Sequence, residues 1–144
     1  MNHSVPLSLY VHIPWCERKC PYCDFNSHEN FNPTLEQPYV AALLNDLEQQ
    51  LNWVQGREIT SIFFGGGTPS LMAPDTVNAI INEVAKHWRV ANDIEITLEA
   101  NPDSVTQEKL NGYIAAGFNR ISFGMQSNQE HVLKVLDRTH NPEK

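Results

Sequence analysis

The chain has 144 residues, enough for one compact domain, and its 41% hydrophobic and 19% charged residues are typical of a folded protein. Its net charge of −7 argues against binding to nucleic-acid phosphates, which requires clustered Lys and Arg. The apolar runs are too short for a transmembrane segment and the first residues do not form a secretory signal, so we expect a cytoplasmic protein.

Segments with strand and helix patterns alternate along the chain. We expect strands over 8–14, 58–64, 93–99 and 119–127, each followed by a helix, over 40–54, 75–88, 106–117 and 129–138. Thr34 and Gln37 have the spacing of a capping box, which predicts the start of the first helix. Successive βα units of this kind indicate a parallel sheet with right-handed crossovers.

The strands alternate apolar and polar residues. In the first strand Val11 and Ile13 share one face while Tyr10 and His12 share the other, and in the fourth strand Met125 continues the apolar face. A sheet covered by helices on both sides has apolar residues on both faces, and a closed barrel fills its interior with them. The pattern therefore favours an α/β fold, an open partial (β/α) barrel that holds a large polar ligand on its inner face. A sheet with one solvated face is the alternative.

Four strands cannot close a barrel. We therefore expect residues 1–144 to be the N-terminal part of a larger domain, with later strands and a C-terminal domain lying beyond it. Tyr10, Glu99 and Gln126 fall where we expect the C-terminal ends of strands, the usual place of an α/β site.

The three cysteines, Cys16, Cys20 and Cys23, lie together in the loop after the first strand. An odd, clustered set does not suit disulfides, so we expect free or metal-bound thiols. Structural zinc takes four ligands, and His12 or His28 is available as the fourth. A cubane iron–sulfur cluster held by three thiolates would instead leave one iron open for a ligand.

The cysteine loop, CERKCPYC, resembles that of the radical S-adenosylmethionine (radical SAM) enzymes. Three further segments, GGGTPS (65–70), LEANP (98–102) and RISFGMQS (120–127), are similar to the branch that contains the oxygen-independent coproporphyrinogen III oxidases and the HemW-type heme chaperones. The resemblance spans nearly the whole chain. It implies a [4Fe-4S] cluster on the three cysteines, with the amino and carboxylate groups of SAM on the fourth iron.

The resemblance also implies which residues contact SAM. Glu99 would accept hydrogen bonds from the ribose, and the full set is Tyr10, Tyr22, Gly66, Gly67, Thr68, Glu99, Gln126 and Arg138. Ordinary structural roles are the alternatives: a glycine turn, an ion pair of Glu99, and a solvated Arg138 at a helix end.

Two functions occur in this branch, an oxidase that decarboxylates coproporphyrinogen III and a chaperone that binds heme and passes it to an acceptor protein. In the oxidase the third cysteine is followed by Gly and Cys, whereas Asp24 and Phe25 follow Cys23 here. The oxidase also has a longer segment before the first strand. Both differences favour the heme chaperone, with the oxidase and a zinc-stabilised binding domain as alternatives.

The electron donor and the residues that contact heme are less well defined by the sequence. The resemblance implies an electron donor such as a flavodoxin or ferredoxin if SAM is cleaved, and it assigns no catalytic residue. No histidine stands out as an axial heme ligand. Arg18 and Lys19 are available to heme propionates, although solvated loop charges are the simpler interpretation.

Overall fold

The computed structural model describes residues 5–54 and 56–143, in which strands and helices alternate along the chain. The order is β1 (Leu7–Ile13), α1 (Glu36–Gln50), β2 (Glu58–Gly66), α2 (Pro74–His87), β3 (Arg89–Ala100), α3 (Gln107–Ala115), β4 (Arg120–Phe123) and α4 (Glu130–Val135). Short 3₁₀ helices flank these elements: η1 (Pro33–Leu35), η2 (Leu51–Trp53), η3 (Pro69–Leu71) and η4 (Pro102–Ser104). The predicted alternation of strands and helices is confirmed.

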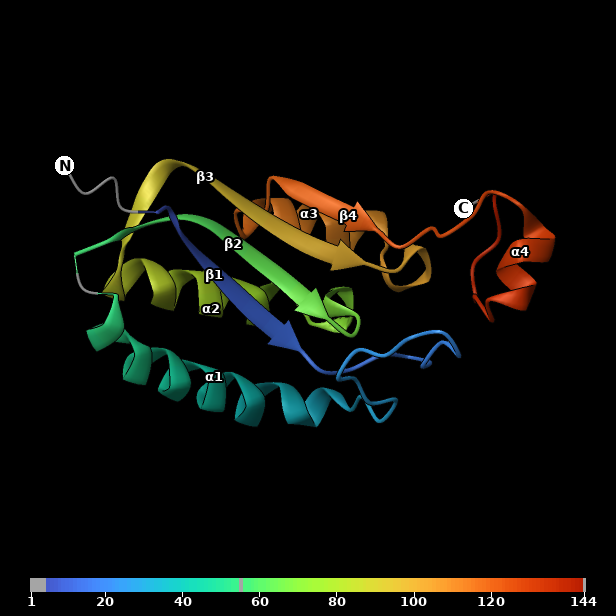
Figure 1. Cartoon of the computed structure of the whole chain (residues 1–144), viewed down its shortest axis with the longest axis horizontal. Helices are drawn as coiled ribbons and strands as arrows, with labels where there is room; N and C mark the ends of the chain where they lie inside the picture. The colour runs from blue at the N-terminus through green and yellow to red at the C-terminus, as the bar shows by residue number, and fades with distance from the viewer. Residues whose placement is uncertain (1–4, 55, 144) are drawn as a thin grey trace.

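The strands form one parallel sheet in the order β1-β2-β3-β4. The register aligns Tyr10 with Phe63, Phe63 with Thr97, and Thr97 with Arg120 across the sheet. All strands therefore point their C-terminal ends to the same edge, as the arrowheads in Figure 1 show. This is the α/β arrangement that the sequence predicts.

The helices α1, α2 and α3 lie on one face of the sheet (Figure 1). Apolar side chains of the strands, such as Ile13, Phe64 and Leu98, are fully buried against them. From the helices, Leu47, Val77, Val84 and other apolar side chains complete one continuous core. Burial of this face is the main favourable contribution to the folding of the sheet.

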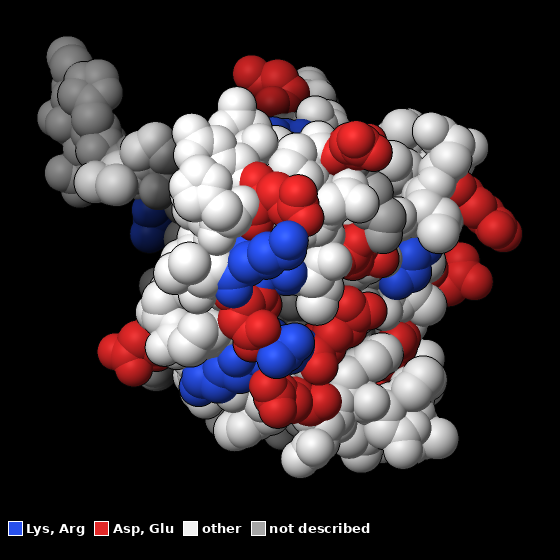
Figure 2. Space-filling model, turned by 90° about the vertical axis from the view of Figure 1, so that its right-hand side faces the viewer, with Lys and Arg blue, Asp and Glu red and all other residues white. Residues whose placement is uncertain are grey.

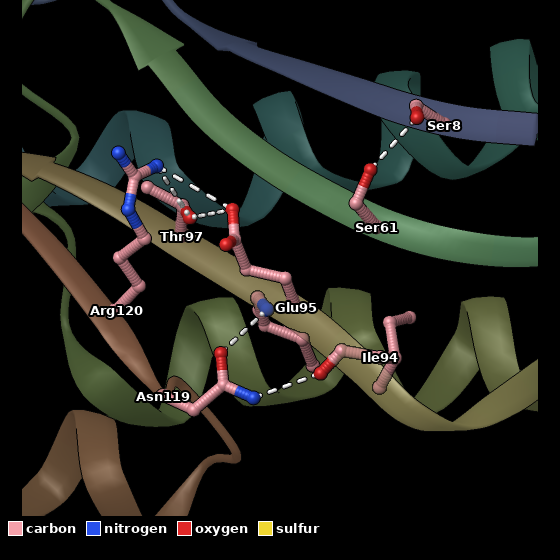
Figure 3. Close-up of polar contacts among 8 residues, drawn as sticks. Ser8, Ser61, Ile94, Glu95, Thr97, Asn119 and Arg120 are labelled. Atoms are coloured by element: carbon pink, nitrogen blue, oxygen red, sulfur yellow. Dashed lines mark hydrogen bonds and ion pairs between the residues drawn. The ribbon is translucent and has the colours of Figure 1, made fainter.

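The opposite face of the sheet, called the open face below, carries polar side chains (Figure 3). Ser61 donates a hydrogen bond to Ser8 at 2.7 Å, and Arg120 lies 3.4 Å from the carboxylate of Glu95 and from the hydroxyl of Thr97. The predicted division into an apolar and a polar face is confirmed. It follows from the two-residue period of strands, which sends alternate side chains to opposite sides.

The capping-box prediction is wrong. The side chain of Asn32 accepts a hydrogen bond from the amide of Thr34 at 3.0 Å and opens η1, so α1 begins only at Glu36. The same helix ends at Gln50 rather than at 54, where η2 takes over. A local asparagine turn thus replaces the expected threonine cap.

The fourth strand is shorter than predicted. Phe123 pairs with Ala100, the last residue of β3, so no partner remains for a longer β4. Beyond it the chain turns sharply, with a positive φ of 64° at Gln126. Met125, expected on the apolar face, is 50% exposed as a result.

None of the helices within the described residues is both long and apolar enough to cross a lipid bilayer.

Candidate functional site

The cysteine loop leaves the C-terminal end of β1 and is closed at its base. Trp15 and His28 form an isolated parallel bridge, in which the amide of Cys16 donates to the carbonyl of His28 at 2.9 Å. Within the loop the amide of Cys23 donates to the carbonyl of Cys20 at 2.9 Å. Backbone hydrogen bonds therefore hold the three cysteines, of which Cys16 is buried and Cys20 and Cys23 are half-buried.

The glycine segment at the end of β2 lies against this loop. Gly66 has a φ of +112°, and a side chain there would meet the ring of His12 at 2.7 Å. At Gly67 a Cβ would lie 2.4 Å from the carbonyl oxygen of Trp15. The packing of the chain itself thus requires glycine at both positions. The structural role considered for these glycines, a glycine turn, is therefore present in the fold, whatever ligand they contact.

A cavity of about 320 Å³ lies at the C-terminal ends of the strands, between the cysteine loop, the glycine segment and Arg138, which follows α4. Most residues predicted for the site line it: Cys16, Cys20, Cys23, Tyr22, Gly67, Thr68, Glu99, Gln126 and Arg138. Segments from both ends of the chain meet here. The fold therefore brings together residues that sequence alone could only group by motif.

Tyr10 and Gly66 line a neighbouring cavity of about 240 Å³ on the open face. Phe25 and Glu99 line both cavities, so the two adjoin. The expectation that Tyr10 and Gln126 lie at strand ends is wrong. Tyr10 lies in the middle of β1, and Gln126 lies beyond the end of β4.

His12 lines the smaller cavity and connects Tyr10 to the cysteine loop through its two ring nitrogens. Its Nε2 lies 2.8 Å from the carbonyl oxygen of Asn26, which can only accept, so Nε2 carries the proton. Nδ1 must then accept from the hydroxyl of Tyr10 at 2.9 Å. With both nitrogens engaged, His12 is an orienting residue rather than a metal ligand in this arrangement.

Arg138 reaches from the end of α4 across the cavity. Its guanidinium donates to Cys20 Sγ at 3.3 Å, to the carbonyl of Gly124 at 2.6 Å and to Asn101 Oδ1 at 3.3 Å. Its Nε is buried without a hydrogen-bond partner among the described residues, and such a donor is costly unless a ligand or water satisfies it. The solvated helix-end alternative for Arg138 is therefore wrong.

Burial shifts the pKa of several groups around the two cavities. It raises the pKa of Glu99, while the backbone N–H of Gly66 acts in the opposite direction. It also raises the pKa of Tyr22, assisted by a hydrogen bond to Cys20 and opposed by the charge of Arg138. The pKa of Tyr10 is raised by burial and by the negative charge of Glu99. Both tyrosines thus remain protonated hydroxyl donors at neutral pH.

The donor set fits a cluster better than a single ion. Among the residues described, no three His, Cys, Asp or Glu side chains converge closely enough to hold one metal ion. Zinc would need its donors around one point at about 2.3 Å. The three thiols instead line one cavity with a guanidinium donor on Cys20, which suits thiolates that share a larger iron–sulfur group.

Sequence reasoning missed several cavity residues. Asn101 and Ser122 line the main cavity, and Asn101 contacts Arg138 there. Outside the cavity, His140 is buried as well, and its Nε2 donates to the carbonyl of Met125 at 2.9 Å. The position of Asn101 in the LEANP segment was the available signal, because it comes two residues after a strand-end carboxylate.

Basic and acidic side chains are interleaved on the face at this end of the molecule, as Figure 2 shows. Arg18 pairs with Asp137 at 2.8 Å, and Lys134 pairs with Glu130 at 2.7 Å. The amine of Lys19 donates to the carbonyl of Phe25 at 3.3 Å. Arg18 and Lys19, considered for heme propionates, are thus already engaged with groups of the chain.

The radical SAM superfamily profile matches residues 10–144 of the chain. The chain belongs to the radical SAM superfamily. It is 49% identical over 138 residues to the heme chaperone HemW of Escherichia coli strain K12, covering 96% of this chain and 36% of that protein. A heme chaperone HemW of Haemophilus influenzae is also 49% identical, over 94% of this chain and 37% of its own length.

A solved radical SAM structure has the same fold. The coproporphyrinogen III oxidase HemN of Escherichia coli superimposes with a TM-score of 0.86 at 29% identity, covering 96% of this chain and 32% of that one. The chain thus spans about a third of the length of the relatives it matches. Membership of the radical SAM superfamily implies SAM and a [4Fe-4S] cluster as cofactors, which agrees with the thiol-lined cavity.

Proposed function

We propose that this chain is the radical SAM part of a cytoplasmic heme chaperone, which binds heme and transfers it to an acceptor protein. The 49% identity to the heme chaperone HemW over 96% of the chain carries the proposal, against 29% to the solved oxidase. On this proposal residues 1–144 form the N-terminal part of the radical SAM domain. The remaining strands and the C-terminal domain belong to the rest of the protein.

The cysteines and the cavity have complementary roles in this proposal. Cys16, Cys20 and Cys23 hold a [4Fe-4S] cluster, which supplies an open iron for the amino and carboxylate groups of SAM and, with an electron from a flavodoxin or ferredoxin, the means to cleave it. The guanidinium of Arg138 donates a hydrogen bond to the sulfur of Cys20 at 3.3 Å and so holds that ligand in place.

The remaining residues bind and orient SAM. Glu99 accepts hydrogen bonds from the ribose. The glycine segment, Gly66, Gly67 and Thr68, contacts SAM in this proposal, and the close packing of the two glycines against His12 and Trp15 fixes its backbone beside the cysteine loop. Tyr10, Tyr22, Gln126 and Arg138 supply donors from the walls of the two adjoining cavities. The buried, unpartnered Nε of Arg138 is one donor that such a ligand would satisfy.

Phe25 separates the chaperone from the oxidase in this proposal. It occupies the position at which the oxidases resembled have a further cysteine, and it lines both cavities. A phenyl ring cannot bind a metal or transfer a proton there. The comparison with HemW points the same way, so the oxidase is not favoured.

The deciding experiment is anaerobic turnover of coproporphyrinogen III by full-length, cluster-reconstituted protein with SAM and an electron donor. We expect no protoporphyrinogen IX from a protein with an intact cluster, together with saturable binding in a heme titration. Multiple turnovers per cluster would make the protein an oxidase and overturn the proposal. Absence of both turnover and heme binding would reject both heme-related functions.

Replacement of one ligand tests the cluster assignment. Cys20→Ala should abolish the SAM-responsive [4Fe-4S] spectrum, because residues 1–144 contain no fourth cysteine to replace Cys20. Iron and sulfide content with electron paramagnetic resonance measures this. Pro21→Ala, an exposed neighbour in the same loop, is the matched control. A full, SAM-responsive cluster in Cys20→Ala would disprove the assignment.

A further inference from the structure

A buried polar network links the two loops that follow β2 and β3. The first loop leads from the glycine segment into η3, and the second leads from Glu99 into η4. Ser70 in η3 is completely buried, and Ser104 in η4 is 8% exposed. Their hydroxyls hydrogen-bond directly to each other.

Counting protons fixes the direction of these hydrogen bonds. The hydroxyl of Ser104 donates to the carbonyl of Asn101 at 2.8 Å, which uses its only proton. Ser70 must therefore donate to Ser104. The oxygen of Ser70 in turn accepts from the amide of Asn101 at 3.3 Å. The result is a closed ring in which both backbone polar groups of Asn101 are held by serine hydroxyls.

The helix α3 holds the same serine from the other side. Lys109 Nζ donates to the carbonyl of Ser70 at 2.6 Å and lies 3.3 to 3.4 Å from the carbonyls of Leu71 and Ser104. The hydroxyl of Tyr113, fully buried, lies 2.9 Å from the carbonyl of Ser70 and 2.7 Å from that of Met72. The amine of Lys109 thus links the carbonyls at the C-terminal ends of η3 and η4.

The network ends at the cavity. With its backbone fixed by the ring, Asn101 presents Oδ1 to Arg138, which also contacts Cys20. Asn101 itself lines the cavity, whereas Ser70 and Ser104 do not. Increased mobility of Ser70 would therefore increase the mobility of Asn101 and of the Arg138 guanidinium that Asn101 contacts. Burying the hydroxyls of Ser70 and Ser104 is costly unless each has a hydrogen-bond partner. Their hydrogen bonds provide those partners and at the same time fix the backbone from which the Asn101 side chain projects.

We propose that Ser70 is a positioning residue, whose hydroxyl and carbonyl lock the two loops together and align Asn101 and Arg138 toward the ligand. It touches no ligand itself. Because the ligand named here is SAM, this inference rests on the proposed function, although the clamp between the loops can be measured without any ligand.

The test compares Ser70→Ala with wild-type full-length protein in two measurements. Amide hydrogen exchange reports the clamp directly, because Ser70 accepts the Asn101 N–H; we expect exchange there to rise about tenfold, as loss of one buried hydrogen bond predicts. The dissociation constant for SAM, measured on cluster-loaded protein, should also rise about tenfold. Ser104→Ala should match both effects, and the double variant should add little, since one ring is broken either way.

Two controls separate positioning from general stability. Ser61→Ala removes an open-face hydroxyl that donates to the hydroxyl of Ser8, a serine pair like that of Ser70 and Ser104. Ile80→Val loosens the core away from the two loops. Neither should change exchange at Asn101 or the affinity for SAM, whereas a loss of affinity that merely follows stability would appear with Ile80→Val too.

The possible outcomes distinguish the clamp between the loops, the positioning role of Ser70 and the proposed function. Unchanged exchange at Asn101 in both serine variants would refute the clamp. Faster exchange with unchanged SAM affinity would refute the positioning role. Wild-type protein that binds no SAM despite an intact cluster would refute the proposed function instead, and exchange at Asn101 would still decide whether the clamp exists.

Discussion

Glu99 illustrates at the residue scale how a site trades stability for binding. Its carboxyl group is half-buried between the two cavities, and burial raises its pKa above the usual value of 4.5. A raised pKa in the folded state means that folding favours the protonated acid. That stabilisation is complete below the unfolded pKa and is lost as the pH rises through the folded pKa.

Glu99→Gln should therefore raise the melting temperature at about pH 7 and leave it nearly unchanged at about pH 4, because the amide carries no charge at either pH. Thermal unfolding at the two pH values measures this. Glu83→Gln is a control with the opposite expected sign, because Lys86 and His87 lower the pKa of Glu83. Removing this carboxylate should lower the melting temperature at neutral pH and have little effect at low pH. A melting temperature that falls on Glu99→Gln at neutral pH would contradict the expectation.

Individual residues differed in how far their sequence revealed them. The cysteines could be predicted as a group because a three-thiol loop has few other uses, and Glu99 because it ends a strand. Asn101 had only its position after Glu99 as a signal, and His140 had none, since their contacts depend on Arg138 and Met125, which are distant in sequence. Tertiary partners of this kind leave no local pattern.

At the scale of elements, alternation along the strands predicted which face meets the helices, and the structure agrees. The ends of elements were predicted less well. The end of β4 depends on where its neighbour β3 stops, and the start of α1 depends on a local competition that Asn32 wins over Thr34. The period of a strand is a property of its own residues, whereas its end is often set by a partner.

The junction of β2 with the cysteine loop is the most sterically constrained of these ends. Gly67→Ala should destabilise the fold by about 1–3 kcal/mol, because its Cβ would lie 2.4 Å from backbone that cannot move aside. Urea denaturation measures the free energy of unfolding. Gly124→Ala is the matched control, since its Cβ would approach the side-chain ends of Gln126 and Arg138 at 3.4 and 3.5 Å and the carbonyl oxygen of Ala100 at 3.7 Å, without a clash. Equal losses in the two variants would contradict the steric argument.

On the scale of the whole molecule, α4 stands apart from the helical layer (Figure 1). Leu133 of α4 is 2% exposed, yet it does not belong to the continuous core that includes Leu47 of α1. The helix α4, which precedes Arg138 in the chain, is therefore stabilised separately from the sheet and its three covering helices.

Truncation of these two leucines should have different effects. Leu47→Ala should lower the free energy of global unfolding by about 2–5 kcal/mol, because it opens a cavity in the main core. Leu133→Ala should instead speed amide exchange mainly within α4 and leave global unfolding much less affected. Denaturation curves together with exchange mapping distinguish the two, and equal global losses would show that α4 is part of the same cooperative unit.

The hydrogen bond between Arg138 and Cys20 can form only after both residues have been synthesised. Strands that neighbour one another in the sheet also follow one another along the chain, so the sheet can form progressively as the ribosome delivers it. Arg138 emerges 118 residues after Cys20. During that interval the cysteine loop exists without the guanidinium that contacts Cys20 in the folded chain.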